Sequence, residues 1–414
     1  MSIESTRAVR WHDLTFVRDG DDVVVGRPDT GSYGVFPPVG AELIRQLDAG
    51  MPWSEVASWW ERRTGESLDV EDFGATVSSL GFLATGGERP VGPSQVRWQR
   101  LGRACFSVPA WILYLLLMGL GLVAMVVDPT SRPGYRQLFF TDHLTLVTLV
   151  LAFGQFPMVL LHEAFHALAA RRLGLPSTLG VGRRYYYLVA ETRLDALYSV
   201  SRRRRFLPLL SGSLIDAVGV GLLTSAATLG HRMGAPSWLT GVALAFATTG
   251  VLRILWEGLF YLETDFYFAI NTLTGCHDLH GASRFYFRRV LAGALRRLPR
   301  ASSDDTSPEH AEWSDHDHRI ARYYAPLMIV GYAISTFTLL TVAAPSALRF
   351  WTTTLDRLSH PSRHTGVELL DATVFALVSL SQLILMGYVL VRDRRARTAR
   401  PATPSSSPSK EELS

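Results

Sequence analysis

The chain has 414 residues, 48% of them hydrophobic, and a mean hydropathy of +0.15, which is too apolar for an ordinary soluble protein. Its formal net charge is +4. Because nearly all of its cations are arginines beside apolar segments, we expect a lipid bilayer and no nucleic acid as its partner. It has two cysteines, Cys105 and Cys276, so we expect neither a disulfide framework nor a cysteine-based metal site.

Residues 1–90 predict a small soluble α+β domain with a winged-helix-like order of elements, and their polar start predicts no cleavable signal peptide. Strand-like runs and then helix patterns are expected over residues 13–17, 22–25, 31–36, 39–48, 53–64 and 69–80. Gly20 lies in the turn between the first two strands. Asp69, with Asp72 three residues later, is expected to cap the third helix.

A linker is expected over residues 91–104, followed by a membrane domain over 105–391 and a disordered cytoplasmic tail over 392–414. Apolar runs of roughly 20 residues predict a polytopic α-helical protein with about six membrane-spanning helices. These helices are expected over residues 105–127, 143–170, 206–229, 237–262, 323–344 and 368–391.

The arginines are distributed unevenly between the predicted loops. Clusters precede the first span, separate spans two and three, separate spans four and five, and follow the sixth. Six crossings would place all four clusters on one side, and such an excess is typical of the cytoplasmic side. We therefore expect both termini, and the domain of residues 1–90, to be cytoplasmic in a cell (inner) membrane.

The second predicted span contains the motif His162-Glu163-Ala164-Phe165-His166 near its cytoplasmic end. Helix positions i and i+4 share a face, so the imidazoles of His162 and His166 can reach one metal ion. Glu163 is not needed as a ligand and can accept a proton from an attacking water. Polar groups at lipid depth are costly unless they face a partner, which favours a metal site over a pair of structural histidines.

A catalytic zinc usually has three protein ligands and one open position. The third ligand has to come from another span at similar depth, and two aspartates qualify: Asp216 in the third span and Asp265 after the fourth. The alternative for Asp216 is a buried carboxyl group that orients a ligand histidine. The residues alone leave both aspartates open.

Two further groups of polar residues have simpler interpretations. Arg253 and Glu257 are four residues apart in the fourth span and are expected to pair with each other. His310, His316 and His318 lie in a polar, acidic stretch that predicts a solvated loop rather than a second metal site.

The motif of residues 162–166 on a membrane helix, followed by an aspartate at the end of a later one, resembles the site-2 protease family of intramembrane zinc metallopeptidases. Residues 262–268, and then 273–279, look like the second motif region of that family's bacterial peptide-maturation branch. The resemblance covers roughly residues 140–290, and the first motif is its most specific part.

This resemblance implies a zinc ion, Zn²⁺, held by His162, His166 and Asp265, with Glu163 as the catalytic general base. Phe266 stands where the family usually has glycine, and no Asn-x-x-Pro precedes the aspartate, so no oxyanion stabiliser is assigned.

The first 90 residues have a likeness of their own. The stretch Trp11-His12-Asp13-Leu14 and the apolar pattern from Val39 to Asp48 resemble PqqD-like peptide-recognition domains. Such domains bind the leader segment of a ribosomally made peptide as an added edge strand. The alternative is a winged-helix-like module with a structural or regulatory use.

These patterns predict a membrane-embedded zinc metalloendopeptidase that processes a ribosomally made or membrane-associated peptide. The stretch from Gly180 to Val189 has strand-like content and is expected to offer an edge to the substrate, which residues 1–90 would tether. The alternative is a non-catalytic membrane peptide-binding, immunity or export factor with a structural metal. A transporter would require broken helices in repeated halves, and no internal repeat is evident.

Overall fold

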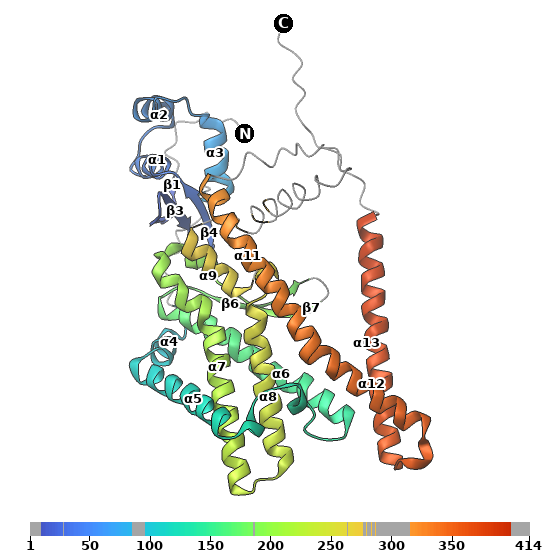
Figure 1. Ribbon diagram of the computed structural model, residues 1–414. Helices are drawn as coiled ribbons and strands as arrows, with labels where there is room; N and C mark the ends of the chain where they lie inside the picture. The colour runs from blue at the N-terminus through green and yellow to red at the C-terminus, as the bar shows by residue number, and fades with distance from the viewer. Residues whose placement is uncertain are drawn as a thin grey trace.

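The computed structural model describes residues 10–27, 29–84, 96–184, 187–262 and 264–275, the single residues Leu279, Ser283 and Tyr286, and residues 315–398. A small N-terminal region of short strands and helices stands at one end of a set of long helices (Figure 1). Six of these are long and apolar enough to cross a membrane. They cover Val108–Val127, Leu144–Arg172, Arg202–Met233, Ser237–Glu257, Arg319–Ser359 and Gly366–Ile384.

The N-terminal region contains the predicted strands and helices in the predicted order. Its elements are β1 (Arg10–Trp11), β2 (Thr15–Asp19), β3 (Asp22–Arg27), β4 (Ser32–Phe36), α1 (Pro38–Asp48), a 3-10 turn (Trp53–Glu55), α2 (Val56–Thr64), α3 (Val70–Ser79) and β5 (Leu83–Ala84). Strands β2, β3 and β4 form an antiparallel sheet, and β1 pairs with β5. Val25, Ile44, Val77 and Phe82 are fully buried between the sheet and the helices.

Local chemistry sets the ends of these elements. Gly20, in the two-residue turn between β2 and β3, has a φ of 71°, which glycine adopts without strain. The Asp69 carboxylate accepts hydrogen bonds from the backbone N–H groups of Glu71 and Asp72, so the predicted cap of α3 is confirmed. The strand predicted over residues 13–17 is β2 in the structure, and it lies two residues later than predicted. The β1–β5 pair, with two residues on each strand, leaves no recognisable pattern in the sequence.

The long helices pack around α7 (Arg202–Met233), which contacts α5 (Val108–Val127), α6 (Leu144–Arg172) and α8 (Ser237–Glu257) (Figure 1). Gly121 of α5 and Gly221 of α7 bring the two backbones together, since a Cβ atom on Gly121 would lie 2.4 Å from the Cα of Gly221. Small residues at a helix crossing allow this approach. Helix α7 is therefore the central helix of the bundle.

Several predicted boundaries are wrong. Residues 99–104, assigned to the linker, belong to the short helix α4 (Gln99–Cys105), which packs on α6. The fourth long helix ends at Glu257 rather than 262. A 3-10 turn (Phe260–Leu262) and the separate helix α9 (Asp265–Thr274) follow it. The apolar residues of the 3-10 turn continue the hydropathy of the fourth long helix, so hydropathy alone cannot locate its end, whereas α4 contains two arginines and therefore resembles a charged linker.

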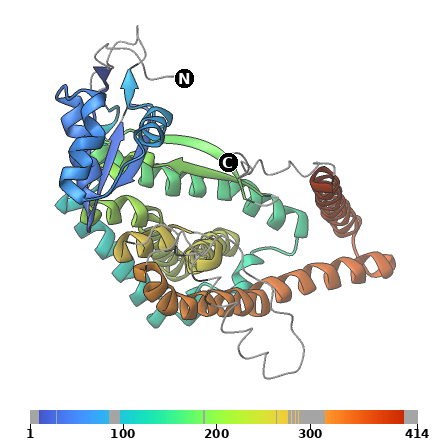
Figure 2. The same cartoon turned by 90° about the horizontal axis from the view of Figure 1, so that it is seen from above.

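The C-terminal helices stand to one side of this bundle (Figure 2). A π-helical turn (Leu339–Ala343) joins α11 (Asp315–Thr338) to α12 (Ala344–Ser359), and α13 (Gly366–Thr398) returns beside α12. Helix α13 continues through residues 392–398, which we expected to be disordered, whereas residues 399–414 lie outside the described residues.

Asp371 of α13 connects these helices to the start of α6. Its two carboxylate oxygens accept hydrogen bonds from the backbone N–H groups of Leu144, at 2.8 Å, and Thr145, at 2.9 Å. Arg357 of α12 donates to the same carboxylate at 2.9 Å and is itself 5% exposed. Two N–H groups in the first turn of α6, which have no partner within the helix, are thus satisfied from another helix.

Buried ion pairs hold the N-terminal region against the start of α7. Asp19 is 8% exposed and accepts hydrogen bonds from Arg205 Nη1, at 2.8 Å, and from Arg202 Nε. Arg205 is 4% exposed and also donates to the backbone oxygen of Tyr198 at 3.3 Å. The Asp19 carboxylate and the Arg205 guanidinium are therefore removed from solvent at this contact, whereas the Arg202 side chain remains 31% exposed.

We expect Asp19→Asn to loosen this contact, because the substitution leaves the buried Arg205 without its carboxylate. Removing one partner of a buried pair costs about 3 kcal/mol. Hydrogen–deuterium exchange should show lower protection of residues 15–27. Asp29→Asn is the matched control, because Asp29 pairs with Arg27 within the N-terminal region at 3.0 Å and does not contact α7. Equal loss of protection in both variants would contradict the prediction.

The stability of the contact between Asp19 and the start of α7 should depend on pH. Burial raises the pKa of Asp19, but the hydrogen bonds and charges of Arg202 and Arg205 lower it by more, so this pKa lies below its ordinary value of 3.8. A carboxylate with a lowered pKa stabilises the contact fully above its ordinary value, and this stability is lost as the pH falls through the lowered pKa. Protection of residues 15–27, corrected for intrinsic exchange, should decrease below pH ~4 in the natural chain and stay low throughout in Asp19→Asn.

Candidate metal centre

Helix α6 presents the two motif histidines on one face, as predicted. His162 is 8% exposed and His166 is 3% exposed. Their Nε2 atoms lie 3.1 Å apart, and the ring centroids are separated by 4.8 Å. The two side chains therefore point into the protein, at one position, and not at lipid.

Asp265 completes this group from a different element. It is the first residue of α9, and its Oδ2 atom lies 2.9 Å from Nε2 of His166 and 3.5 Å from Nε2 of His162. Among the described residues, His162, His166 and Asp265 are the one set of three histidine, cysteine or acidic side chains whose ligand atoms converge, all within 4.8 Å of one another. The structure thus places Asp265 with the motif histidines.

Glu257 holds the start of α9 in place. The backbone N–H of Asp265 donates to Oε2 of Glu257 at 2.9 Å, and the Thr264 hydroxyl donates to the backbone oxygen of Glu257 at 2.7 Å. Glu257 is 8% exposed. The end of α8 therefore fixes the backbone of Asp265.

Asp216 lies on the other side of His162. Its Oδ2 atom is 2.9 Å from Nδ1 of His162, and its Oδ1 atom accepts hydrogen bonds from Arg253 Nε at 3.0 Å and Nη2 at 2.8 Å. A carboxylate on Nδ1 fixes the tautomer of a histidine and directs Nε2 toward a metal. Of the two aspartates that the sequence left open, Asp216 has the geometry of an orienting group and Asp265 that of a ligand.

The expected pair between Arg253 and Glu257 is wrong. Arg253 also donates to Oε1 of Gln155, so its guanidinium bridges α7 and α6 instead of bonding within α8. A buried carboxylate such as Asp216 requires a positive partner, and this requirement outweighs the local spacing of four residues.

The second ring nitrogen of His166 also has a partner from α7. Nδ1 of His166 lies 2.7 Å from the backbone oxygen of Pro208, which can only accept a hydrogen bond, so Nδ1 carries a proton and Nε2 has the lone pair when the ring is neutral. In neutral rings, the two Nε2 atoms are thus the nitrogens that can ligate a metal, and both lie near Oδ2 of Asp265.

Gly212 leaves room for this arrangement. A Cβ atom at this position of α7 would lie 2.2 Å from Nε2 of His166 and 2.4 Å from Nε2 of His162, closer than any real side-chain contact. The absence of a side chain at Gly212 therefore lets α7 pass directly beside the two Nε2 atoms.

The donor set fits zinc. Two imidazole nitrogens and one carboxylate oxygen are a frequent ligand set of catalytic zinc sites. Bonds of 2.0–2.1 Å in a tetrahedral arrangement separate neighbouring ligand atoms by roughly 3.3 Å. The three separations among His162, His166 and Asp265 are 2.9, 3.1 and 3.5 Å. One zinc ion with a fourth, open position is compatible with these residues.

Glu163 lies outside this ligand group. Its half-buried side chain accepts a hydrogen bond from the Thr192 hydroxyl, with 2.7 Å between Thr192 Oγ1 and Glu163 Oε2. Thr192 belongs to β7 (Tyr187–Arg193), which pairs antiparallel with β6 (Thr178–Arg184). The strand content predicted for residues 180–189 is therefore confirmed as part of a hairpin that contacts α6, and residues 185–186 lie outside the described residues.

We expect Asp216→Asn to lower the metal affinity of this centre by roughly 10- to 100-fold, because groups that orient a ligand histidine contribute about this factor. Zinc affinity measured by competition with a chromophoric chelator tests the prediction. Asp371→Asn is the matched control, since it breaks another buried aspartate–arginine pair, with Arg357 at 2.9 Å, at the opposite end of α6. A similar loss of affinity in both variants would show that Asp216 acts only through stability.

Sequence reasoning missed Gly212, Thr192 and the backbone oxygen of Pro208. A glycine or proline in an apolar span has many structural uses, so no signal in the sequence separates these from other residues of the span. The prediction of a solvated loop is wrong for His316 and His318, which lie in the first turn of α11, although their side chains are outside the described residues. Residues 276–278 and His310 lie outside the described residues altogether.

Comparison of the chain with protein-family models, curated proteins and solved structures gives no match. The class of the protein thus rests on features of the described residues: they are mainly helical, with six apolar helices of membrane-spanning length, a small N-terminal region with strands, and one group of two buried histidines and a half-buried aspartate.

Proposed function

We propose that the chain is a multi-pass protein of the cell (inner) membrane and a zinc-dependent metalloendopeptidase that hydrolyses a peptide bond during maturation of a peptide. One observation carries this proposal: both imidazole Nε2 atoms of the motif converge with Oδ2 of Asp265, beside Glu163. Six crossings put the N-terminal region and both termini on the arginine-rich, cytoplasmic side.

Each residue of the centre has a role in this reaction. His162, His166 and Asp265 would hold a zinc ion, which would supply a Lewis acid for the scissile carbonyl and for the attacking water. Glu163 accepts the proton of the attacking water and returns it to the leaving amine. Asp216 and the backbone oxygen of Pro208 keep both imidazoles in the ligating tautomer.

The hairpin of β6 and β7 gives the substrate a place beside this centre. Thr192 of β7 contacts Glu163 directly, so a peptide that adds to this hairpin as a further strand lies near the general base. The N-terminal region, held by Asp19 at the start of α7, tethers the leader segment of the substrate and raises its local concentration. In this proposal, it is a PqqD-like domain.

Metal removal tests the proposal. The full chain in detergent should contain about one zinc ion per molecule by mass spectrometry, and His166→Ala should contain almost none. Cleavage of a mixture of membrane-inserted peptides should stop with 1,10-phenanthroline and resume when zinc is added back. Cleavage that persists at full rate in the chelator, or in His166→Ala, would contradict zinc-dependent hydrolysis.

One observation favours a second candidate, a non-catalytic peptide-binding, immunity or export factor with a structural metal. The Glu163 carboxylate already accepts a hydrogen bond from Thr192, and a purely structural Glu163 would be held in this way. This candidate predicts stoichiometric zinc and saturable peptide binding, with no cut product from any peptide of the mixture.

A further inference from the structure

A cavity of about 680 Å³ lies where three long helices and a short one meet, close to the N-terminal region. Its walls come from the turn between α4 and α5, the last residue of α6 and the first two turns of α7 (Figure 1). Four arginines line it: Arg103, Arg172, Arg203 and Arg204. No residue of its lining is acidic.

The four guanidinium groups have no counter-charge of their own. Within the described part of the chain, none of them forms an ion pair or a side-chain hydrogen bond, although Arg202 and Arg205 beside them are both bound to Asp19. Like charges gathered in one cavity repel each other, and a bound anion removes this cost. Arginine binds phosphate oxygens with two parallel hydrogen bonds, which makes a phosphate group the best-fitting anion.

The remaining wall of the cavity is apolar apart from Ser107. Phe106 and Leu207 are largely or partly buried there, and Val108, the first residue of the candidate span α5, is 72% exposed. A free phosphate ion gains nothing from such a surface, whereas a phospholipid can place its headgroup on the arginines and its acyl chain along Val108. The combination therefore favours a lipid over a soluble anion.

We propose that this cavity binds the headgroup phosphate of an anionic phospholipid, through Arg103, Arg172, Arg203 and Arg204. Arg172 lies six residues after His166 on α6, about 9 Å along the helix, and Arg203 lies in the first turn of the helix that carries Gly212 and Asp216. The lipid thus bridges the end of α6, which carries the two histidines, and the start of α7, which orients them. Its binding is independent of whether the centre hydrolyses peptides.

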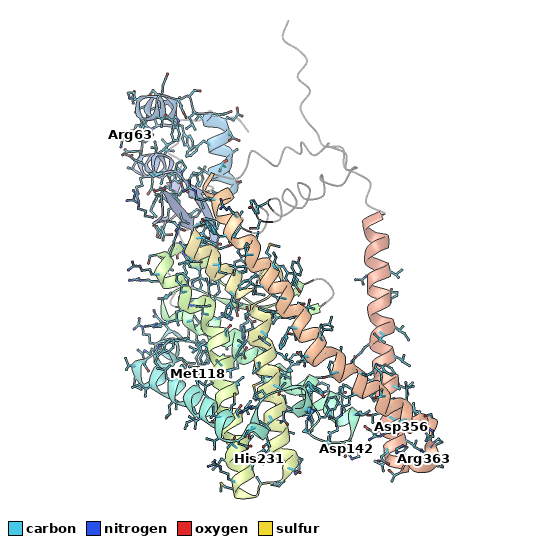
Figure 3. The ribbon with its side chains drawn as sticks, in the orientation of Figure 1. Arg63, Met118, Asp142, His231, Asp356 and Arg363 are labelled. Atoms are coloured by element: carbon cyan, nitrogen blue, oxygen red, sulfur yellow. The ribbon has the colours of Figure 1, made fainter. Side chains whose placement is uncertain are left out.

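The test uses the full chain in detergent, titrated with phosphatidylglycerol and analysed by native mass spectrometry. Arg203→Gln/Arg204→Gln should bind this lipid about 30-fold more weakly, from roughly a fivefold factor per arginine near an anionic headgroup. Arg232→Gln/Arg363→Gln is the matched control with the same loss of charge. Figure 3 places Arg363, and His231 beside Arg232, at the end of the molecule opposite the N-terminal region, which contains Arg63. This control should bind as the natural chain does.

Further measurements distinguish lipid binding from binding of other ligands, and a loss of binding from misfolding. Phosphatidylcholine and inorganic phosphate alone should each bind weakly, and a glutamate-rich peptide should not displace phosphatidylglycerol. Arg203→Lys/Arg204→Lys, which keeps the charge, should retain most of the binding and so shows that the fold is intact. Equal weakening in the control variant, equally tight binding of phosphatidylcholine or phosphate, or displacement by the acidic peptide would each overturn the proposal.

Discussion

Glu163→Gln should retain zinc and lose peptide cleavage by a factor on the order of 10³. Glutamine has the shape of glutamate and can still accept a hydrogen bond from Thr192 Oγ1, now 2.7 Å from Glu163 Oε2. It cannot accept a proton at neutral pH. His162, His166 and Asp265 are unchanged, so metal binding should be retained while the proton transfer from water is lost. The measurement is the cleavage rate at saturating peptide together with zinc content.

The control for this substitution is Glu61→Gln, the same chemical change at an exposed position of α2. It should retain both zinc and full activity. Activity of Glu163→Gln within about threefold of the natural chain would exclude Glu163 as the general base, since removing such a group costs at least ~10². Loss of zinc together with activity would instead assign Glu163 a structural role in the centre.

Gly212→Ala should lower zinc affinity by roughly 10- to 100-fold, the factor that disturbed positioning of ligand histidines typically has. The added Cβ atom would meet Nε2 of His166 at 2.2 Å and Nε2 of His162 at 2.4 Å, so the imidazoles or the backbone of α7 have to move. Alanine also favours a helix over glycine by about 1 kcal/mol, so general unfolding is not expected. Zinc affinity and thermal stability, measured together, test this prediction.

Two glycines of the same helix provide matched controls. A Cβ atom on Gly219 would have no atom within 4 Å, so Gly219→Ala should leave both zinc affinity and stability intact. A Cβ atom on Gly221 would lie 2.5 Å from the backbone oxygen of Leu117, so Gly221→Ala should destabilise the crossing of α5 and α7. If Gly221→Ala lowers zinc affinity as much as Gly212→Ala, the effect is one of packing and the prediction is wrong.

Much of the fold could be predicted because it depends on local patterns. Hydropathy over about 20 residues locates the six long helices, and the carboxylate of Asp69 locates the start of α3. The end of α8 could not be placed, because Gly258 and the apolar residues after it continue the same hydropathy. Whether such residues extend a helix depends on the tertiary contacts that Glu257 makes with the start of α9.

Only the part of the centre that lies within one helix, the pair of histidines, was predictable from the sequence. The spacing of His162 and His166 determines that they share a face in any helix, and the structure confirms it. The choice between Asp216 and Asp265 depends on how α7 and α9 pack on α6, which no spacing within one helix contains. The same limit explains the error at Arg253, whose partner Asp216 is 37 residues away on another helix.

The centre is built from two parts that are secured independently of each other. On one side, Asp216 and the backbone oxygen of Pro208, both on α7, contact the Nδ1 atoms of the two imidazoles, and neither contact involves Asp265. On the other side, Asp265 is the first residue of the ten-residue helix α9, and its backbone N–H donates a hydrogen bond to the Glu257 carboxylate. The contacts that orient the two histidines thus do not depend on Asp265. A metal ion held here would therefore be exchanged by a displacement of the short helix α9 alone, without movement of α6 or α7.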